Sequence, residues 1–530
     1  MADQMAFVKG SLILICANAT AKILGAVFKI PLTYVLREEG MAIYQTAFSV
    51  YIMMLSLVPG GFGFATTKLL GECCALCEEK RASAIVRGMA VLLGVFGAFV
   101  AALMYMSADF LAIAMREPSA PDAIRVISVA VMVVAISSSV KSFNEADAHY
   151  IPTALSQVIE AAIKLLLGLF FAKLFKSCGK EPAVGALLAV VVGEAFQTIF
   201  LYVIWLFSRK NIPHTFITKQ DTVKILSVAI PLTLTGLATG ALAMTETAVI
   251  RNALSDIRFT QASAYEFLKC YSSYTDAFNS LPSRLFLTAD GVRKLYGAFS
   301  GYAQTVFNLP VGIAATLTAA ATPLFSRSIT VGGVVDTEKT AVKVLMPVYF
   351  IIVPTSLVCT FFPRELLQLI FNNSFASGML MVSAPAMLFL CASNMFIGIL
   401  HLHSRIYEPF IAILLSLAVK IVATAILVRI PCINILGAGY AQVLSSLCLF
   451  VCVFCMTKRI TGIKPDIVRC AAIPFLSGCV MIGAMKLTLF LLPFLKEGRL
   501  SFFISCLVGG GVYCGAHYVL TGKSLVHIKD

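Results

Sequence analysis

Ionisable and amide side chains interrupt several long apolar segments of this sequence, and their spacing suggests a chemistry. In the segment 8–35, Asn18, Lys22 and Lys29 are separated by four and seven residues. This spacing places them on one face of a helix. A charge at the centre of a bilayer costs about 2.5–3.5 kcal/mol on insertion scales, so such residues usually face a wet cavity or a partner. Lysines sharing one face predict an anion site, and several of them can share the charge of a diphosphate.

Other apolar segments carry further ionisable residues. Glu160 and Lys164 are four residues apart, a spacing at which a carboxylate and an ammonium group neutralise each other on a helix. In the segment 222–254 we expect Glu246 to tune or pair with Arg251. Lys420 lies in the middle of another apolar segment. The complete set of candidate cavity residues is Asn18, Lys22, Lys29, Lys164, Glu246, Arg251, Gln304 and Lys420.

The basic residues outnumber the acidic ones in this set, so a shared cavity would attract an anion. The alternative is structural: Lys29 extends its ammonium group to the membrane surface, and the other charges form ion pairs within the protein. Glu194 and Lys486 are the two intramembrane charges that we expect to be structural in either case.

The composition requires a membrane protein around these residues. The chain has 530 residues, of which 59% are apolar and 13% charged, and its mean hydropathy is +0.91. A soluble domain has about 25% charged residues. These values exclude a water-soluble globular protein, a disordered chain and a nucleic-acid binder. The net charge of +14 is then best explained by Lys and Arg in cytoplasmic loops.

The apolar segments predict an all-α integral membrane protein, because a spanning helix needs about 20 mainly apolar residues. The predicted spans are 8–35, 41–66, 84–107, 123–144, 152–175, 183–208, 222–254, 297–326, 341–362, 376–400, 407–430, 436–457, 466–492 and 500–521, which makes fourteen. With both termini inside, the cytoplasmic segments hold about 20 Lys and Arg and the short outer loops about 10. The sequence therefore predicts a multi-pass protein of the plasma membrane with both termini in the cytoplasm.

A weak internal similarity at an offset near 256 residues suggests a repeat. Tyr150-Ile151-Pro152 begins one predicted helix and Tyr407-Glu408-Pro409 another, and each is followed by a mid-helix lysine. We predict an N-terminal lobe of six helices over 1–220 and a C-terminal lobe of six over 221–460. Two additional helices and a cytoplasmic tail occupy 461–530. A repeat with an even number of helices keeps its orientation in the membrane.

The sequence predicts neither a metal site nor a catalytic residue. Cys74 and Cys77 form a lone C-x-x-C with no second pair at metal-binding spacing. The chain contains no P-loop and no G-x-S-x-G motif. We therefore expect a transporter and not an enzyme, with no cofactor other than a coupling ion.

Several short motifs resemble stage V sporulation protein B-like membrane proteins of the multidrug/oligosaccharidyl-lipid/polysaccharide (MOP) exporter superfamily. The first is Ala21-Lys22-Ile23-Leu24-Gly25 followed by Lys29-Ile30-Pro31-Leu32. The others are Glu39-Gly40-Met41-Ala42-Ile43-Tyr44-Gln45, Ile151-Pro152-Thr153-Ala154-Leu155-Ser156-Gln157-Val158-Ile159-Glu160, Leu295-Tyr296-Gly297, Phe307-Asn308-Leu309-Pro310 and Ile435-Leu436-Gly437-Ala438-Gly439. They cover nearly all of the predicted repeat region.

This resemblance implies a two-lobed fold that works by alternating access. It implies transport of a polyprenyl-linked saccharide or peptidoglycan precursor, which in sporulating relatives serves the spore cortex. Lys22 resembles an essential basic residue in the first helix of lipid II flippases, and the last two helices resemble a groove for the lipid tail. The implied partners are a lipid-linked anionic substrate, membrane lipids and wall-synthesis proteins, with no nucleic acid.

The sequence also departs from the lipid II flippases. Those proteins carry an Asp-Arg pair after two aromatic residues, where this chain has Tyr302-Ala303-Gln304-Thr305. The segment 255–289 is also longer than is usual for the subgroup. The missing pair keeps open a non-transporting scaffold of a wall-synthesis complex. A cation-coupled multidrug antiporter is a further alternative, although fourteen spans and a basic cavity argue against it. The energy source, an ion gradient or the membrane potential, also stays open.

Overall fold

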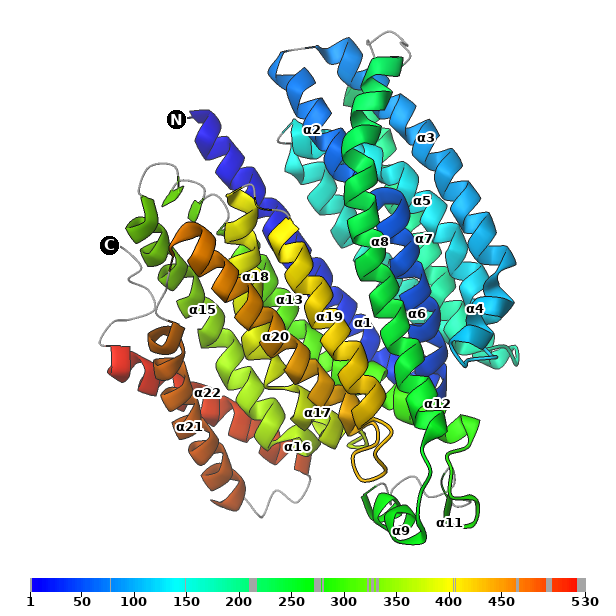
Figure 1. Ribbon diagram of the computed structural model, residues 1–530, viewed down its shortest axis with the longest axis vertical. Helices are drawn as coiled ribbons and strands as arrows, with labels where there is room; N and C mark the ends of the chain where they lie inside the picture. Colours follow the sequence, from blue (N-terminus) through cyan, green and yellow to red (C-terminus); the bar gives the residue numbers. More distant parts are fainter. Residues whose placement is uncertain are drawn as a thin grey trace. The chain divides into compact units, whose positions relative to one another are not determined.

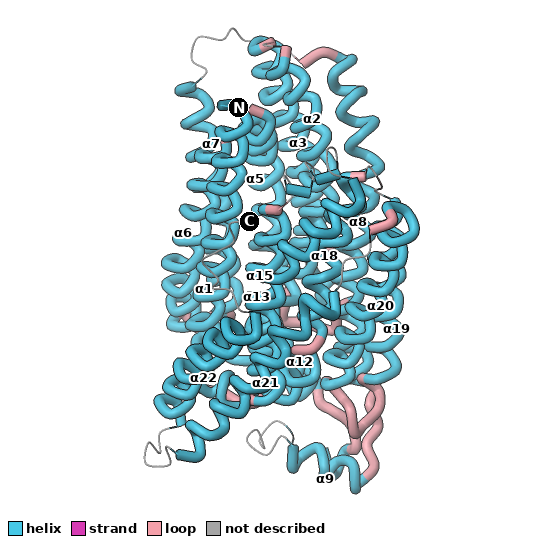
Figure 2. The backbone as a smooth tube through the Cα atoms, turned by 90° about the vertical axis from the view of Figure 1, so that its left-hand side faces the viewer, coloured by secondary structure: helices cyan, strands magenta, loops and turns pink. Residues whose placement is uncertain are grey.

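The computed structural model describes an entirely helical arrangement of two compact units (Figures 1 and 2). The described residues are 2–76, 78–147, 149–208, 217–270, 278, 281–321, 324–325, 328–329, 333–403, 405, 407–463, 467–491 and 498–521. Unit 1 comprises Met1–Ser255 and Ala289–Gly301, and unit 2 comprises Asp256–Thr288 and Tyr302–Asp530. The regular elements of the described residues are all helices, as the composition predicts.

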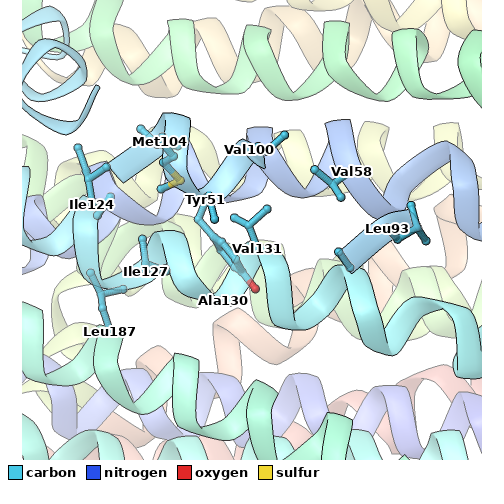
Figure 3. Packing of buried hydrophobic residues seen from close by; sticks show 14 of the residues in the cluster. Tyr51, Val58, Leu93, Val100, Met104, Ile124, Ile127, Ala130, Val131 and Leu187 are labelled. Atoms are coloured by element: carbon cyan, nitrogen blue, oxygen red, sulfur yellow. The ribbon is translucent and has the colours of Figure 1, made fainter. Parts of the chain in front are cut away.

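Unit 1 is a bundle of long helices around an apolar core. Its elements are α1 (Ala2–Leu55), η1 (Ser56–Gly60), α2 (Gly61–Ala75), α3 (Glu79–Met106), α4 (Ala108–Ala114), α5 (Pro121–Ala146), α6 (Tyr150–Ser177), α7 (Pro182–Ser208), α8 (Lys219–Asp256) and α12 (Ala289–Ala298). The helices α3, α5, α7 and α6 pack side by side, and α1 packs against α6 (Figure 1). Figure 3 shows part of this core, with Tyr51 of α1 beside Ala130 and Val131 of α5.

The break that we predict between the first two spans, at 36–40, is present as a kink at Arg37. The element α1 runs from Ala2 to Leu55, but Arg37, with φ 54° and ψ −167°, leaves the helical conformation and separates two helical stretches. A positive φ is uncommon for a residue that has a side chain, so Arg37 marks a sharp local change of direction. Further along, the chain changes to a π-helical turn at η1, which contains Pro59.

A hydrogen-bonded anchor fixes the start of α8. The hydroxyl of Thr218 accepts from the backbone nitrogen of Asp221 at 3.1 Å and donates to its carboxylate at 2.7 Å, which is a capping arrangement. Arg81 of α3 reaches the same carboxylate at 2.6 Å. The hydrogen bond from Arg81 lowers the pKa of Asp221 below its ordinary value. This pair therefore ties α3 to α8 across 140 residues of sequence.

Unit 2 is also a helical bundle. Its elements are α9 (Gln261–Cys270), α11 (Leu281–Arg284), α13 (Gln304–Ala320), α15 (Gly333–Phe361), α16 (Pro363–Phe371), α17 (Ser377–Ser383), α18 (Ala386–Leu402), α19 (Tyr407–Leu427), α20 (Leu436–Thr461), α21 (Ile467–Leu491) and α22 (Gly498–Thr521). The π-helical turn η3 (Phe299–Ala303) precedes α13. The helices α18 and α19 pack against α20, and α21 packs between α15 and α22.

The segment 255–289, whose length is unusual, folds back on unit 2 through aromatic contacts. The ring of Phe267 in α9 meets the rings of Phe259 and Phe278 edge to face, at 5.4 and 5.2 Å. Phe278 stacks on Phe375 at 6.5 Å. These rings are buried, and edge-to-face aromatic pairs stabilise beyond the area they bury. The described part of this segment is therefore an ordered helical appendage of unit 2.

Nine helices of the described residues are long and apolar enough to cross a membrane, and up to ten if the pair α17–α18, bent by 42°, is one span. This confirms the all-α, multi-pass fold class. The count of fourteen stays a prediction, although helices such as α6 and α13 coincide with further predicted spans. The lobe boundaries at residues 220 and 460 also stay a prediction; the described compact units keep residues 221–255 with unit 1.

Candidate functional site

Lys164 lies between two carboxylates inside unit 1. Its Nζ donates to Oε1 of Glu160, one turn earlier on α6, and to Oε1 of Glu194 on α7 at 3.1 Å. The three side chains are largely buried, with exposed fractions of 22%, 17% and 9% for Lys164, Glu160 and Glu194. The i,i+4 pair expected from the sequence is present, and Glu194 takes part in an ion pair, which fits a structural role. We call these three residues the α6–α7 ion cluster.

A polar chain extends this cluster to α5. The ammonium group of Lys141 donates to Oε1 of Gln197 at 2.8 Å, and the amide of Gln197 donates to the hydroxyl of Ser156 at 3.4 Å. Gln197 is fully buried. Lys141 also acts electrostatically on Glu194, so two cations balance two carboxylates in this region. Lys141 is not among the candidates predicted from the sequence, although an ionisable residue within an apolar helix is itself a signal of function.

A second buried cluster joins four parts of unit 1. Nη2 of Arg251 on α8 lies 2.6 Å from Oε2 of Glu117, and Nε of Arg293 on α12 donates to the other oxygen of that carboxylate at 2.9 Å. The side chains of Arg251 and Glu117 are 1% and 0% exposed. Arg251 also donates to the hydroxyl of Thr46 on α1 at 3.0 Å and to the carbonyl oxygen of Arg116 at 2.7 Å. We call Glu117, Arg251 and Arg293 the arginine–glutamate cluster.

The sequence alone did not identify Glu117 as the carboxylate that binds Arg251. Glu117 falls in a short connection between two predicted spans, where charged residues are normally exposed. No periodicity marks it, and its partner is 134 residues away. Tyr296 completes the surroundings, with its ring 5.5 Å from the Arg251 guanidinium and its hydroxyl 3.1 Å from that of Thr247. Glu246 is half-buried on α8, and its effect on Arg251 stays a prediction.

The remaining candidates divide between the two units. The side chains of Asn18 and Lys22 lie outside the described part of the chain. Lys29 is half-buried on α1, and in the described residues no carboxylate lies within ion-pair distance of its ammonium group. Gln304 on α13 and Lys420 on α19 are half-buried in unit 2. The structure thus places Lys164 and Arg251 in two separate clusters of unit 1, and a shared cavity stays a prediction.

Replacing Lys164 by methionine is expected to lower the free energy of unfolding in detergent by about 3 kcal/mol or more, because Glu160 and Glu194 lose their common counter-ion in a buried site. An SDS-unfolding titration measures this loss. Because the two carboxylates then repel each other, lowering the pH should recover part of the stability by protonating one of them. The control is Lys173→Met, which changes an exposed lysine of the same helix. Equal stability of the two variants would contradict a stabilising role for the α6–α7 ion cluster.

Two family models cover most of the sequence. The model described as polysaccharide biosynthesis protein matches residues 7–329. The model described as lipid II flippase MurJ matches residues 296–509. The first match alone covers more than half of the chain and crosses both of the clusters described above.

One relative and two solved structures are similar to this chain over most of its length. Stage V sporulation protein B of Bacillus subtilis (strain 168) is 24% identical over 452 residues, which is 84% of this chain and 82% of that protein. The lipid II flippase MurJ in an inward closed conformation has a TM-score of 0.68 at 14% identity, covering 96% of this chain and 99% of that one.

An inward-facing multidrug resistance MATE family transporter of the MOP superfamily has a TM-score of 0.64 at 13% identity. It covers 85% of this chain and 98% of that one. At these identities the structures establish the fold, and the fold is that of a multi-pass integral membrane protein. The chain therefore belongs to the polysaccharide biosynthesis protein family, and it is stage V sporulation protein B-like and related in sequence to the lipid II flippase MurJ.

Proposed function

We propose that this protein is a flippase or exporter of a polyprenyl-diphosphate-linked saccharide or peptidoglycan precursor for the cell wall or the spore cortex. Family membership supports the polysaccharide pathway, and the similarity to a sporulation protein over 84% of the chain supports the spore or wall context. The fold shared with the lipid II flippase MurJ supports movement of a lipid-linked substrate. Such a protein moves its substrate by alternating access between two lobes.

The observation that carries this proposal is the uncompensated charge of Lys29. In the bilayer a lysine is normally paired or faces water. In unit 1 the carboxylates Glu160, Glu194 and Glu117 are already bound by cations of their own clusters. Lys29 has no such partner in the described residues. An anionic group of the substrate supplies the missing counter-charge, and a diphosphate carries enough charge for several lysines.

The ion pairs of unit 1 reduce the number of cations that can bind the substrate. Lys164 and Arg251 each bind carboxylates, so they offer less charge to a substrate than the sequence implies. We therefore assign the diphosphate first to Lys29, and we keep Lys22, Lys420, Asn18 and Gln304 as the further candidates that the sequence suggests. Secondary roles fall to Lys164, Arg251 and Glu246, whose charges contribute to the electrostatic field around the substrate.

The proposal includes the finer architecture. Fourteen spans form two six-helix lobes and a C-terminal pair, in the plasma membrane, with both termini in the cytoplasm. The C-terminal pair corresponds to α21 and α22, which pack against each other. Several large apolar side chains on this pair are exposed, among them Phe490 and Leu507, as a surface beside a lipid tail requires.

The test measures lipid-linked precursor on the outer face of the membrane after depletion of the protein. Cells that carry Lys29→Ala, or Lys22→Ala with Lys29→Ala, should expose at least about tenfold less precursor, since each lost charge-assisted contact weakens binding by about 1.5–3 kcal/mol. Lys29→Arg should retain partial activity because it keeps the charge. Lys68→Ala on α2 changes an exposed lysine and serves as the control.

The remaining outcomes distinguish the alternatives. Full complementation by the double lysine variant, with normal outward exposure, would favour the scaffold and contradict transport. Proton- or sodium-driven cation efflux from vesicles, without precursor movement, would favour the multidrug antiporter. The likeness to a MATE family transporter is a likeness of fold, so it does not choose between these substrates.

A further inference from the structure

A cavity of about 680 Å³ lies at one end of unit 1, apart from both ion clusters. The helices α3 and α6 end there and α5 and α7 begin there. Its walls combine aromatic residues (Tyr105 and Phe175), charged residues near the helix ends and aliphatic residues further along the helices. Nothing in the proposed transport function uses this cavity.

The two helices that form its walls change from charged to apolar in the same direction. On α7 the lining residues are Val184, Leu188 and Val191, and Glu181 directly precedes the helix. The spacing of three or four residues places the three apolar side chains on one face. At about 1.5 Å per residue this face extends about 10 Å. On α5, Asp122 and Arg125 near the start of the helix are followed by Val129. Charged residues at the helix ends (the rim) and aliphatic residues further along are complementary to an amphiphile, with its polar headgroup at the former and its apolar tail along the latter.

The charges of the rim come in both signs. Arg125 lies 3.0 Å from Asp122 and 2.6 Å from Asp109 of α4. These two contacts use two of the five donors of the guanidinium group. Lys180 lies 6.0 Å from the ring of Phe175 and is followed directly by Glu181. The lining therefore contains two cations, Arg125 and Lys180, and two carboxylates, Asp122 and Glu181.

This balance disfavours a purely anionic ligand, because a lone phosphate would meet as many carboxylates as cations. A zwitterionic headgroup satisfies both sets, with its phosphate at the cations and its ammonium group at the carboxylates. A primary ammonium group donates three hydrogen bonds to such acceptors, whereas a quaternary one donates none. Tyr105, which is 52% exposed, is a residue type enriched at the membrane interface.

We propose that this cavity binds a phospholipid with a zwitterionic headgroup and a primary ammonium group. The phosphate lies at Arg125 and Lys180, and the ammonium group lies at Asp122 and Glu181. One acyl chain follows the apolar wall of α5 and α7 past Val129 and Leu188. The bound lipid fills the space between α3 and α7 and supports unit 1 from its lipid-facing side.

The test purifies the full protein from vesicles of equal parts phosphatidylethanolamine, phosphatidylcholine and phosphatidylglycerol, and quantifies the retained lipid by native mass spectrometry. The wild type should retain phosphatidylethanolamine over phosphatidylcholine by about three- to tenfold, the effect of one or two charge-assisted contacts at a partly exposed site. Lys180→Ala and Asp122→Asn, both on exposed side chains, should each reduce this ratio towards one without loss of folding.

Matched controls locate the effect. Lys173→Ala changes an exposed lysine of α6 outside the cavity lining and should leave the ratio unchanged. Val129→Trp, which fills the cavity, should reduce total retained lipid. If the protein retains the three lipids in the same proportions as the vesicles contain them, the proposal is overturned. A preference for phosphatidylglycerol would also overturn it. An unchanged ratio in both Lys180→Ala and Asp122→Asn would also overturn it. Because none of these readouts involves transport, they are independent of the proposed flippase function.

Discussion

Glu117→Gln is expected to lower the free energy of unfolding of the protein by about 3–5 kcal/mol, the largest effect that we expect from a single side chain. The substitution leaves Arg251 buried at 1% exposure with its charge uncompensated, and breaking a buried ion pair from one side costs about this much. The same change removes a partner of Arg293. SDS-unfolding titration or thermal unfolding in detergent measures the loss.

Two further variants make this result interpretable. Asp290 contacts Arg293 at 3.4 Å but is 71% exposed, so Asp290→Asn should change stability by less than about 1 kcal/mol. Replacing both members of the buried pair, with Glu117→Gln and Arg251→Met, should recover part of the loss because no buried charge is left alone. If Glu117→Gln unfolds at the same point as Asp290→Asn, the arginine–glutamate cluster does not hold α8, α12 and α1 together.

Gly297→Ala is expected to be similarly destabilising, by about 3 kcal/mol or more, because α12 approaches the backbone of α1 at this residue. A Cβ on Gly297 would overlap the carbonyl oxygen of Glu38, and it would lie 2.7 Å from the carbonyl carbon and 3.2 Å from the nitrogen of Ala42. Backbone atoms inside a packed bundle cannot shift as a flexible side chain can, so the helices must separate. Thermal unfolding in detergent measures the effect.

Gly71→Ala is the matched control for Gly297→Ala. Gly71 lies in α2, and nothing lies within 4 Å of the position of its added Cβ. An alanine there should be neutral or should stabilise by up to about 1 kcal/mol, because glycine is the more costly residue to order in a helix. Equal unfolding of the two alanine variants would show that the approach of α12 to Glu38 is not close in solution.

Gly297 also explains one of the motifs in the sequence. Leu295-Tyr296-Gly297 is part of the family resemblance, yet the sequence alone gives no reason for it. In the structure Tyr296 covers the guanidinium group of Arg251 and donates to Thr247, and Gly297 lets α12 reach α1. The motif is thus a packing element beside the arginine–glutamate cluster. We therefore do not assign it to substrate binding.

The membrane-spanning character of the chain, two helix starts and one ion pair could be predicted from the sequence. The apolar content required membrane helices, because a surface of ordinary polarity cannot cover so much apolar material. The helices α6 and α19 begin at the predicted Tyr150 and Tyr407, since proline shortly after a helix start marks such a boundary. The pair Glu160–Lys164 followed from helical periodicity alone. Each of these inferences depends on residues that are close together in the chain.

Only the tertiary structure decided which distant charges meet. It brought Glu194 to Lys164 across 30 residues and Glu117 to Arg251 across 134, and it gathered Arg125 and Lys180 at one cavity. It also placed the predicted break in α1 at one residue, Arg37. The physical reason is that periodicity specifies the face of a helix on which a residue lies, whereas the partner of a buried charge depends on how separate helices pack.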